Sequence, residues 1–117
     1  MKKILIADDA MFMRLSLKSM LERHGFEIVG EAENGEEAIE KYKLLKPDIV
    51  TLDITMPVMD GLEALKQIKN FDQNAKVIMI SSMGQETIVR EAVVSGALGF
   101  IVKPFKEETI IRVFSKL

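Results

Sequence analysis

The 117-residue chain has no cysteine and no tryptophan, and only one histidine. Without cysteine, disulfide-stabilised folds and thiolate metal sites are excluded. His24 comes at the end of a predicted helix, where interaction with the helix C-terminus is its ordinary role, so we do not assign it to a metal site. Any metal in this protein is therefore expected to have oxygen ligands.

Long apolar segments and an excess of one charge are also absent. No apolar run approaches the roughly 20 residues that a membrane span requires. Lys2 and Lys3 are followed by only four apolar residues, too few for a signal peptide. The 16 basic and 18 acidic side chains nearly balance, which excludes a basic face for nucleic acid or for a membrane surface. We expect a cytoplasmic protein without nucleic-acid or membrane partners.

Short apolar runs alternate with segments of helical periodicity, which predicts one compact α/β domain. The five runs expected to form strands are 4–7, 27–32, 49–52, 77–80 and 100–102. The apolar faces expected on the helices are Met13, Leu17, Met20, Leu21 and His24; Ala38, Ile39, Tyr42 and Leu45; Leu62, Leu65 and Ile68; Ile88, Ala92 and Val93; and Ile110, Val113, Phe114 and Leu117. Gly25 and Gly96 are expected to end two of the helices.

Because most of these runs are continuously apolar and not alternating, they indicate a doubly wound parallel sheet with helices on both faces. Right-handed crossovers then place the carboxyl ends of all five strands at the same edge, where ligands bind. Four of the runs end in a chargeable or hydroxyl group, and all these groups should meet at that edge. They are Asp8 with Asp9, Asp53, Ser81 and Lys103.

The three aspartates would repel one another unless a cation lay between them, so the pattern implies either a bound metal or raised pKa values. An all-oxygen set with room for water suits Mg²⁺. Lys103 and Ser81 would add a positive charge and a hydroxyl donor, and the whole set describes a pocket for a phosphoryl group with Asp53 as the nucleophile. Taken singly, each residue has a simpler role, such as helix capping for Asp9 or Ser81 and surface exposure for Lys103.

The segments DD at 8–9, LDITMPVMDG at 52–61, SSMG at 81–84 and GFIVKPF at 99–105 resemble receiver domains of two-component response regulators, especially those of chemotaxis. The resemblance covers the whole chain and implies the flavodoxin-like strand order 2-1-3-4-5. It also implies a single receiver domain over residues 1–117 with no output domain. The alternative is a receiver domain excised from a longer regulator.

The resemblance implies a role for each residue of the motifs. Asp53 would accept the phosphoryl group, Ser81 and Lys103 would bind it, and Phe100 would be an aromatic switch. Mg²⁺ would be held by Asp8, Asp9, Asp53 and the backbone carbonyl of Thr55. The Lys103–Pro104 bond matches a cis peptide of the family.

The implied partners are a chemotaxis-type histidine kinase, the flagellar motor switch protein and a dedicated phosphatase, acting on a monomer. The chain would catalyse only its own phosphorylation and dephosphorylation and is not otherwise expected to be an enzyme. Thr55 and Met83 lie where family members orient the hydrolytic water, and neither offers a strong base or an amide. We therefore expect slow self-dephosphorylation.

Three other functions are weaker interpretations. An aspartyl-nucleophile Mg²⁺ phosphatase of the haloacid dehalogenase type usually has a second aspartate where this chain has Thr55. A flavodoxin-like FMN carrier would place its phosphate beside Asp8 and Asp9, which would repel it. A receiver that is never phosphorylated is disfavoured because no group of the site is missing.

Overall fold

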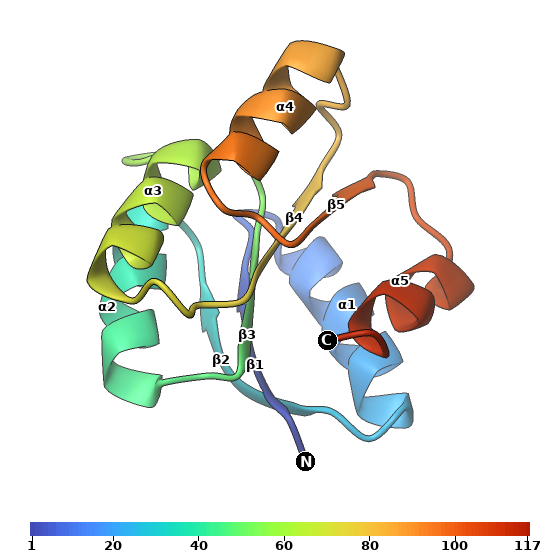
Figure 1. The fold of residues 1–117 in the computed structure, drawn as a ribbon. Coiled ribbons are helices and arrows are strands. Elements are labelled where there is room, and N and C mark those ends of the chain that lie inside the picture. Colours follow the sequence, from blue (N-terminus) through green and yellow to red (C-terminus); the bar gives the residue numbers. More distant parts are fainter.

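The computed structural model describes residues 1–117 as five strands that alternate with five helices along the chain (Figure 1). The strands are β1 (Lys3–Ala7), β2 (Glu27–Ala32), β3 (Ile49–Leu52), β4 (Val77–Ser81) and β5 (Gly99–Val102). The helices are α1 (Met11–Arg23), α2 (Gly35–Leu45), α3 (Gly61–Phe71), α4 (Glu86–Val94) and α5 (Glu107–Phe114). The number, order and type of the elements confirm the sequence prediction.

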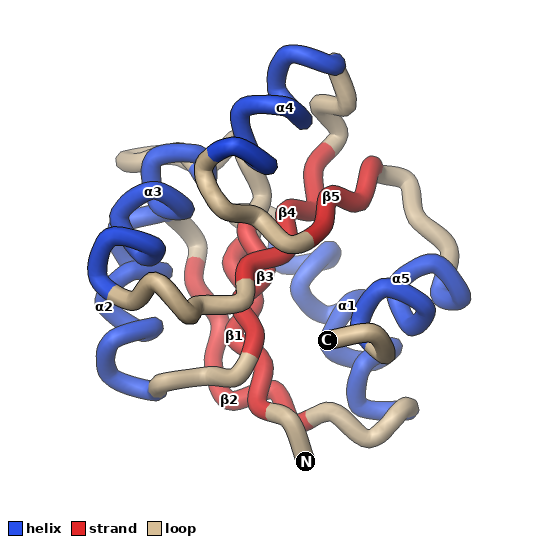
Figure 2. The backbone as a smooth tube through the Cα atoms, in the orientation of Figure 1, coloured by secondary structure: helices blue, strands red, loops and turns tan.

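All neighbouring strands are parallel, and their order is β2-β1-β3-β4-β5. This confirms the doubly wound α/β class and the order that the family resemblance implied. Figure 2 shows the five strands running through the middle of the molecule, with helices on both sides. Parallel pairing requires a crossover after each strand, and each crossover here contains a helix.

Each face of the sheet carries its own hydrophobic core, because successive side chains of a strand point to opposite faces. On β1, Ile4 and Ile6 pack with residues of α1 and α5, whereas Leu5 and Ala7 pack with residues of α2 and α3. Figure 1 shows α1 and α5 on one side of the sheet and α2 and α3 on the other. Neither core covers the carboxyl ends of the strands, where polar residues follow.

N-cap side chains and glycines delimit several helices. Asn34 and Asp60 are the N-caps of α2 and α3, and each side chain accepts a hydrogen bond of 2.8 Å from a backbone amide of the first turn. Gly25 and Gly96 follow α1 and α4 with φ angles of +87° and +108°, a conformation that favours glycine.

The N-caps of α1 and α4 are Ala10 and Gln85, so the simpler role of helix capping applies to neither Asp9 nor Ser81. Two predictions about the helix faces were wrong. Val93 is 57% exposed, because α4 buries only Ala92 against the sheet. Helix α5 ends at Phe114, so Leu117 lies beyond it and is only partly buried.

No helix combines the length and the apolar character needed to cross a membrane.

Candidate functional site

The two central strands bring Asp8 and Asp53 together. Ala7 of β1 is paired with Leu52 of β3, and each aspartate is the first residue after its strand. The backbone N–H of Asp53 donates to the carbonyl of Ala7 at 3.0 Å, which extends the ladder to Asp53. Both side chains are nearly buried, with residue exposures of 6% for Asp8 and 7% for Asp53. The sheet therefore fixes two carboxyl groups side by side at its carboxyl edge.

Asp9 completes an acidic cluster at this edge. One carboxylate oxygen from each of Asp8, Asp9 and Asp53 lies within 4.8 Å of the others. Asp9 is exposed, so solvent reaches the cluster from its side. The convergence of the three aspartates confirms the prediction made from the strand ends.

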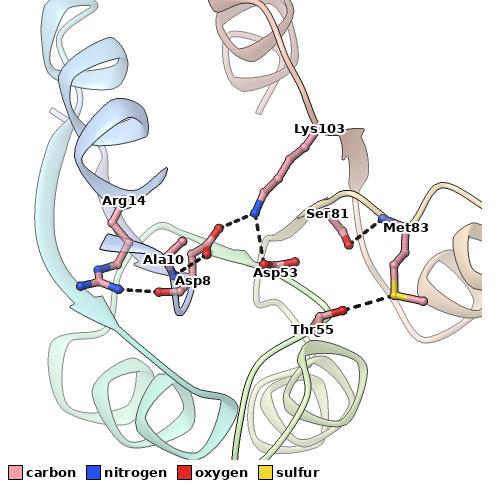
Figure 3. A network of polar contacts seen from close by, with 8 residues as sticks. All are labelled: Asp8, Ala10, Arg14, Asp53, Thr55, Ser81, Met83 and Lys103. Atoms are coloured by element: carbon pink, nitrogen blue, oxygen red, sulfur yellow. Dashed lines mark hydrogen bonds and ion pairs between the residues drawn. The ribbon is translucent and has the colours of Figure 1, made fainter. Parts of the chain in front are cut away.

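Lys103 bridges the two buried carboxylates, as Figure 3 shows. Its Nζ donates to Asp8 Oδ2 at 2.7 Å and to Asp53 Oδ2 at 3.1 Å. The lysine follows β5, and its side chain is only 16% exposed. A buried pair of carboxylates would be strongly destabilising without a cation, so this ammonium group stabilises the site.

The charges of the site shift its pKa values. Burial raises the pKa of Asp53, and although Lys103 opposes this shift, the neighbouring Asp8 carboxylate adds to it. Burial on its own lowers the pKa of Lys103, but the hydrogen bond to Asp8 and the charges of Asp53 and Asp8 outweigh burial and raise it. The lysine is therefore held in its charged form between two anions.

The donor set fits Mg²⁺. The oxygens come from three carboxylates, and the exposed Asp9 leaves room for water on one side. Mg²⁺ is typically bound by one or two carboxylates while it keeps several waters. Asp8, Asp9 and Asp53 would hold it, and the carbonyl of Thr55 as a further ligand stays a prediction of the family resemblance.

Ser81 lies at the end of β4 and is fully buried. Its Oγ accepts a hydrogen bond of 3.1 Å from the backbone N–H of Met83, and a hydroxyl retains its own proton for donation. Thr55 Oγ1 donates to the sulfur of Met83 at 3.3 Å. Figure 3 shows Met83 reaching from the Ser81 segment across to Thr55. The two residues expected to control access of water thus contact each other.

The remaining predicted residues lie on β5 and just after it. Phe100 pairs with Met79 of β4 and is partly buried against the core on the α2 and α3 side of the sheet. The Lys103–Pro104 peptide is cis, as the resemblance implied. Every candidate residue named from the sequence therefore lies at the carboxyl edge of the sheet or on the strand that leads to it.

The backbone after Asp53 packs tightly against α3. Gly61, the first residue of α3, donates its N–H to the carbonyl of Ile54 at 2.8 Å. A Cβ atom at position 61 would lie 1.9 Å from the carbonyl oxygen of Asp53. Gly61 therefore sets how closely α3 approaches Asp53.

Sequence reasoning missed Arg14. This residue is buried in the first turn of α1, and its Nη1 donates to the carbonyl of Asp8 at 2.6 Å. Its position relative to Leu17 and Leu21 was a usable signal, because residues three and seven apart share a helix face. A charged residue on a buried face must have partners, so this spacing alone pointed to a polar contact at the edge of the sheet.

Comparisons with known proteins agree with this geometry. Residues 4–115 match the model of the response regulator receiver domain family. Chemotaxis protein CheY of Thermotoga maritima is 53% identical over 99% of this chain and 97% of that relative, and CheY of Bacillus subtilis is 54% identical over 97% and 95%. Among solved structures, the CheX-CheY-BeF3-Mg²⁺ complex of Borrelia burgdorferi contains a chain with 44% identity and a TM-score of 0.95, covering 98% of this chain and 87% of that one.

Proposed function

Because the chain belongs to the response regulator receiver family, we propose that Asp53 accepts a phosphoryl group from a histidine kinase and that this modification changes the affinity of the protein for a partner. The observation that carries the proposal is the Lys103 bridge. A lysine that already contacts Asp53 at 3.1 Å is placed to contact a phosphoryl group attached to that carboxylate.

The proposed reaction is an in-line displacement. An Asp53 carboxylate oxygen attacks the phosphorus of a phosphohistidine, the phosphorus–nitrogen bond breaks, and the imidazole leaves with the bonding electron pair and regains a proton from solvent. Lys103 pairs with the negative charge on the transferred oxygens, and Ser81 donates its hydroxyl proton to one of them. Mg²⁺ held by Asp8, Asp9 and Asp53 would add positive charge next to the same oxygens.

The switch that we propose uses Phe100. Phosphorylation adds up to about two negative charges next to Ser81, which draws the hydroxyl and the segment that follows β4 toward the phosphoryl group. Phe100 lies on the strand paired with β4, so movement of β4 changes the space available to its ring. The exposed surface of β5 and the helices on either side of it would then differ between the two states.

The names of the relatives guide the proposed partners. Two of them are called chemotaxis protein CheY, which supports a chemotaxis histidine kinase upstream and the flagellar motor switch protein downstream. The structure of a CheX-CheY complex supports a partner of the CheX type, which we propose as the dedicated phosphatase. In this proposal residues 1–117 act as one domain in the cytoplasm, and the response is produced by a partner protein.

The test is direct phosphorylation of the purified chain. Incubation with a small-molecule phosphodonor and Mg²⁺ should add the mass of one phosphoryl group to the wild type and none to the Asp53→Asn variant. Omitting Mg²⁺ should greatly slow the gain of mass. A gain that persists in Asp53→Asn would refute the assignment of the acceptor.

Partner binding needs a separate measurement. The protein treated with BeF3⁻ and Mg²⁺ should bind the purified motor switch protein more tightly than the untreated protein does. Equal affinity of the treated and untreated forms would exclude this partner as the output of the switch.

A further inference from the structure

Apart from Lys103, Arg14 is the one buried cation of the protein. It contacts the acidic cluster through the main chain of Asp8. Its side chain is 8% exposed. Besides the bond from Nη1 to the Asp8 carbonyl, Nε donates to Glu31 Oε1 at 2.8 Å, and Nη2 lies 3.6 Å from Glu33 Oε1. Figure 3 shows the guanidinium on the opposite side of Asp8 from Lys103. Arg14 therefore connects helix α1, the edge strand β2 and the main chain of Asp8.

With this contact, every polar group of Asp8 has a partner within the protein. Its N–H donates to the carbonyl of Ala32 at 3.0 Å, and its own carbonyl accepts from Arg14. Oδ1 accepts the backbone N–H of Ala10 at 2.9 Å, and Oδ2 accepts Lys103. The main chain and the carboxylate of Asp8 are both fixed, so this residue has little freedom to change its orientation.

We propose that Arg14 is a positioning residue for the metal site: by fixing the Asp8 main chain, it holds the Asp8 carboxylate toward Asp53 before the metal arrives. The inference rests on the proposed function, because it concerns the Mg²⁺ site of that function. A planar guanidinium suits this task, because its fork of donors can grip Glu31 and the Asp8 carbonyl at the same time. A lysine carries its three N–H donors on one nitrogen, so it lacks the fixed planar fork that here reaches Glu31 from Nε and the Asp8 carbonyl from Nη1.

Charge and geometry make opposite predictions for the loss of Arg14. Its positive charge lies close to the cluster, so on charge alone its removal would tighten the binding of a cation. Loss of the positioning contact would instead free the Asp8 main chain and weaken binding, and comparable changes around metal sites typically cost 10- to 100-fold in affinity. Two variants separate these effects. Arg14→Met removes both the charge and the donors, whereas Arg14→Lys keeps the charge and loses the fork.

The experiment is a Mg²⁺ titration of ¹⁵N-labelled protein followed by NMR, which reports the dissociation constant and the amide of Ala10. We expect both Arg14 variants to bind Mg²⁺ about tenfold or more weakly than the wild type. The Ala10 amide should also shift in the metal-free variants, because its hydrogen bond to Asp8 depends on the position of Asp8. Arg23→Met is the matched control, since it removes the same charge from an exposed position of the same helix and should leave affinity unchanged.

The outcomes separate the two proposals. Wild-type protein that binds no Mg²⁺ would refute the proposed function together with this inference. Two results would refute the positioning role alone, provided that the wild type binds Mg²⁺. One is unchanged affinity in both Arg14 variants. The other is tighter binding in Arg14→Met with unchanged binding in Arg14→Lys. A urea denaturation curve for each variant confirms that it is folded. If Arg14→Met does not fold, Arg14→Lys carries the test alone, because it keeps the charge and loses only the fork of donors.

Discussion

Replacing Gly61 with alanine should move the segment that carries Asp53, the proposed phosphoacceptor, although alanine is normally the better helix residue. The added Cβ would lie 1.9 Å from the carbonyl oxygen and 2.7 Å from the carbonyl carbon of Asp53. These are main-chain atoms, so no side-chain rotation can relieve the contact. Either the start of α3 or the segment after β3 must move by about 1.4 Å to restore normal carbon–oxygen contact distances of about 3.3 Å.

The energy terms favour a net loss of stability. Alanine within a helix is favoured over glycine by about 1 kcal/mol. Against this, overpacking that shifts the backbone costs about 1–3 kcal/mol, and weakening the hydrogen bond from Gly61 to Ile54 costs about 1 kcal/mol. We therefore expect Gly61→Ala to lower the free energy of unfolding by about 1–3 kcal/mol.

The rate of phosphorylation should fall more steeply than stability, because a misplacement of about 1 Å can cost about 100-fold in rate. Urea denaturation measures the stability, and mass spectrometry after incubation with a small phosphodonor measures the rate. Gly30→Ala is the matched control, since it lies on β2 and its Cβ would meet only side-chain ends, Leu45 Cδ1 at 2.6 Å and Leu5 Cδ1 at 3.4 Å. Wild-type stability and rate in Gly61→Ala would refute the argument.

Three further predictions concern other parts of the chain. Val58 is 76% exposed and has a φ angle of +68°, a conformation that is costly for a β-branched residue. Val58→Asn should therefore raise the free energy of unfolding, measured by urea denaturation, by about 1 kcal/mol. No gain in stability would mean that the loop is unstrained. Tyr42 is the only tyrosine, and burial with a hydrogen bond to Asp72 raises its pKa. Its contribution to stability should be complete below pH of about 10 and lost as pH rises, and ultraviolet phenolate absorbance with an ordinary midpoint near 10 would contradict this. Thr55 and Met83 contact each other and neither is a strong base or an amide, so the phosphorylated protein should lose its phosphoryl group slowly in Mg²⁺. A lifetime of seconds without a phosphatase would contradict this.

The sequence was sufficient for the fold class and for the convergence of the site, because both follow from one regularity. Continuous apolar strands separated by helices require a parallel sheet, and a parallel sheet places Asp8, Asp53, Ser81 and Lys103 at one edge. The order of the strands came from the resemblance to receiver domains and not from the residues alone. The structure confirms that order, and the comparisons confirm the resemblance.

Details that depend on tertiary contacts could not be predicted. Asp9 had the residue type of an N-cap, but Ala10 takes that position and its amide is bound by Asp8. Val93 had core spacing, but α4 lies so that only Ala92 is fully buried. The close approach of Gly61 to Asp53 is a distance between segments, and no local pattern reports it. Each of these details depends on how segments pack in the folded protein, and the periodicity of the sequence does not report that packing.

Asp8 and Asp53 follow the adjacent strands β1 and β3, which leaves unequal flanks, with β2 on one side and β4 and β5 on the other. On the first flank, Glu31 of β2 contacts Arg14, which in turn contacts the main chain of Asp8. On the other flank, β4 and β5 supply the hydroxyl, the aromatic ring and the ammonium group, which are the parts expected to respond to a new charge on Asp53. Phosphorylation of Asp53 would therefore be expected to move β4 and β5, while β2 and Arg14 stay in place. The strand order itself would determine which side of the sheet responds.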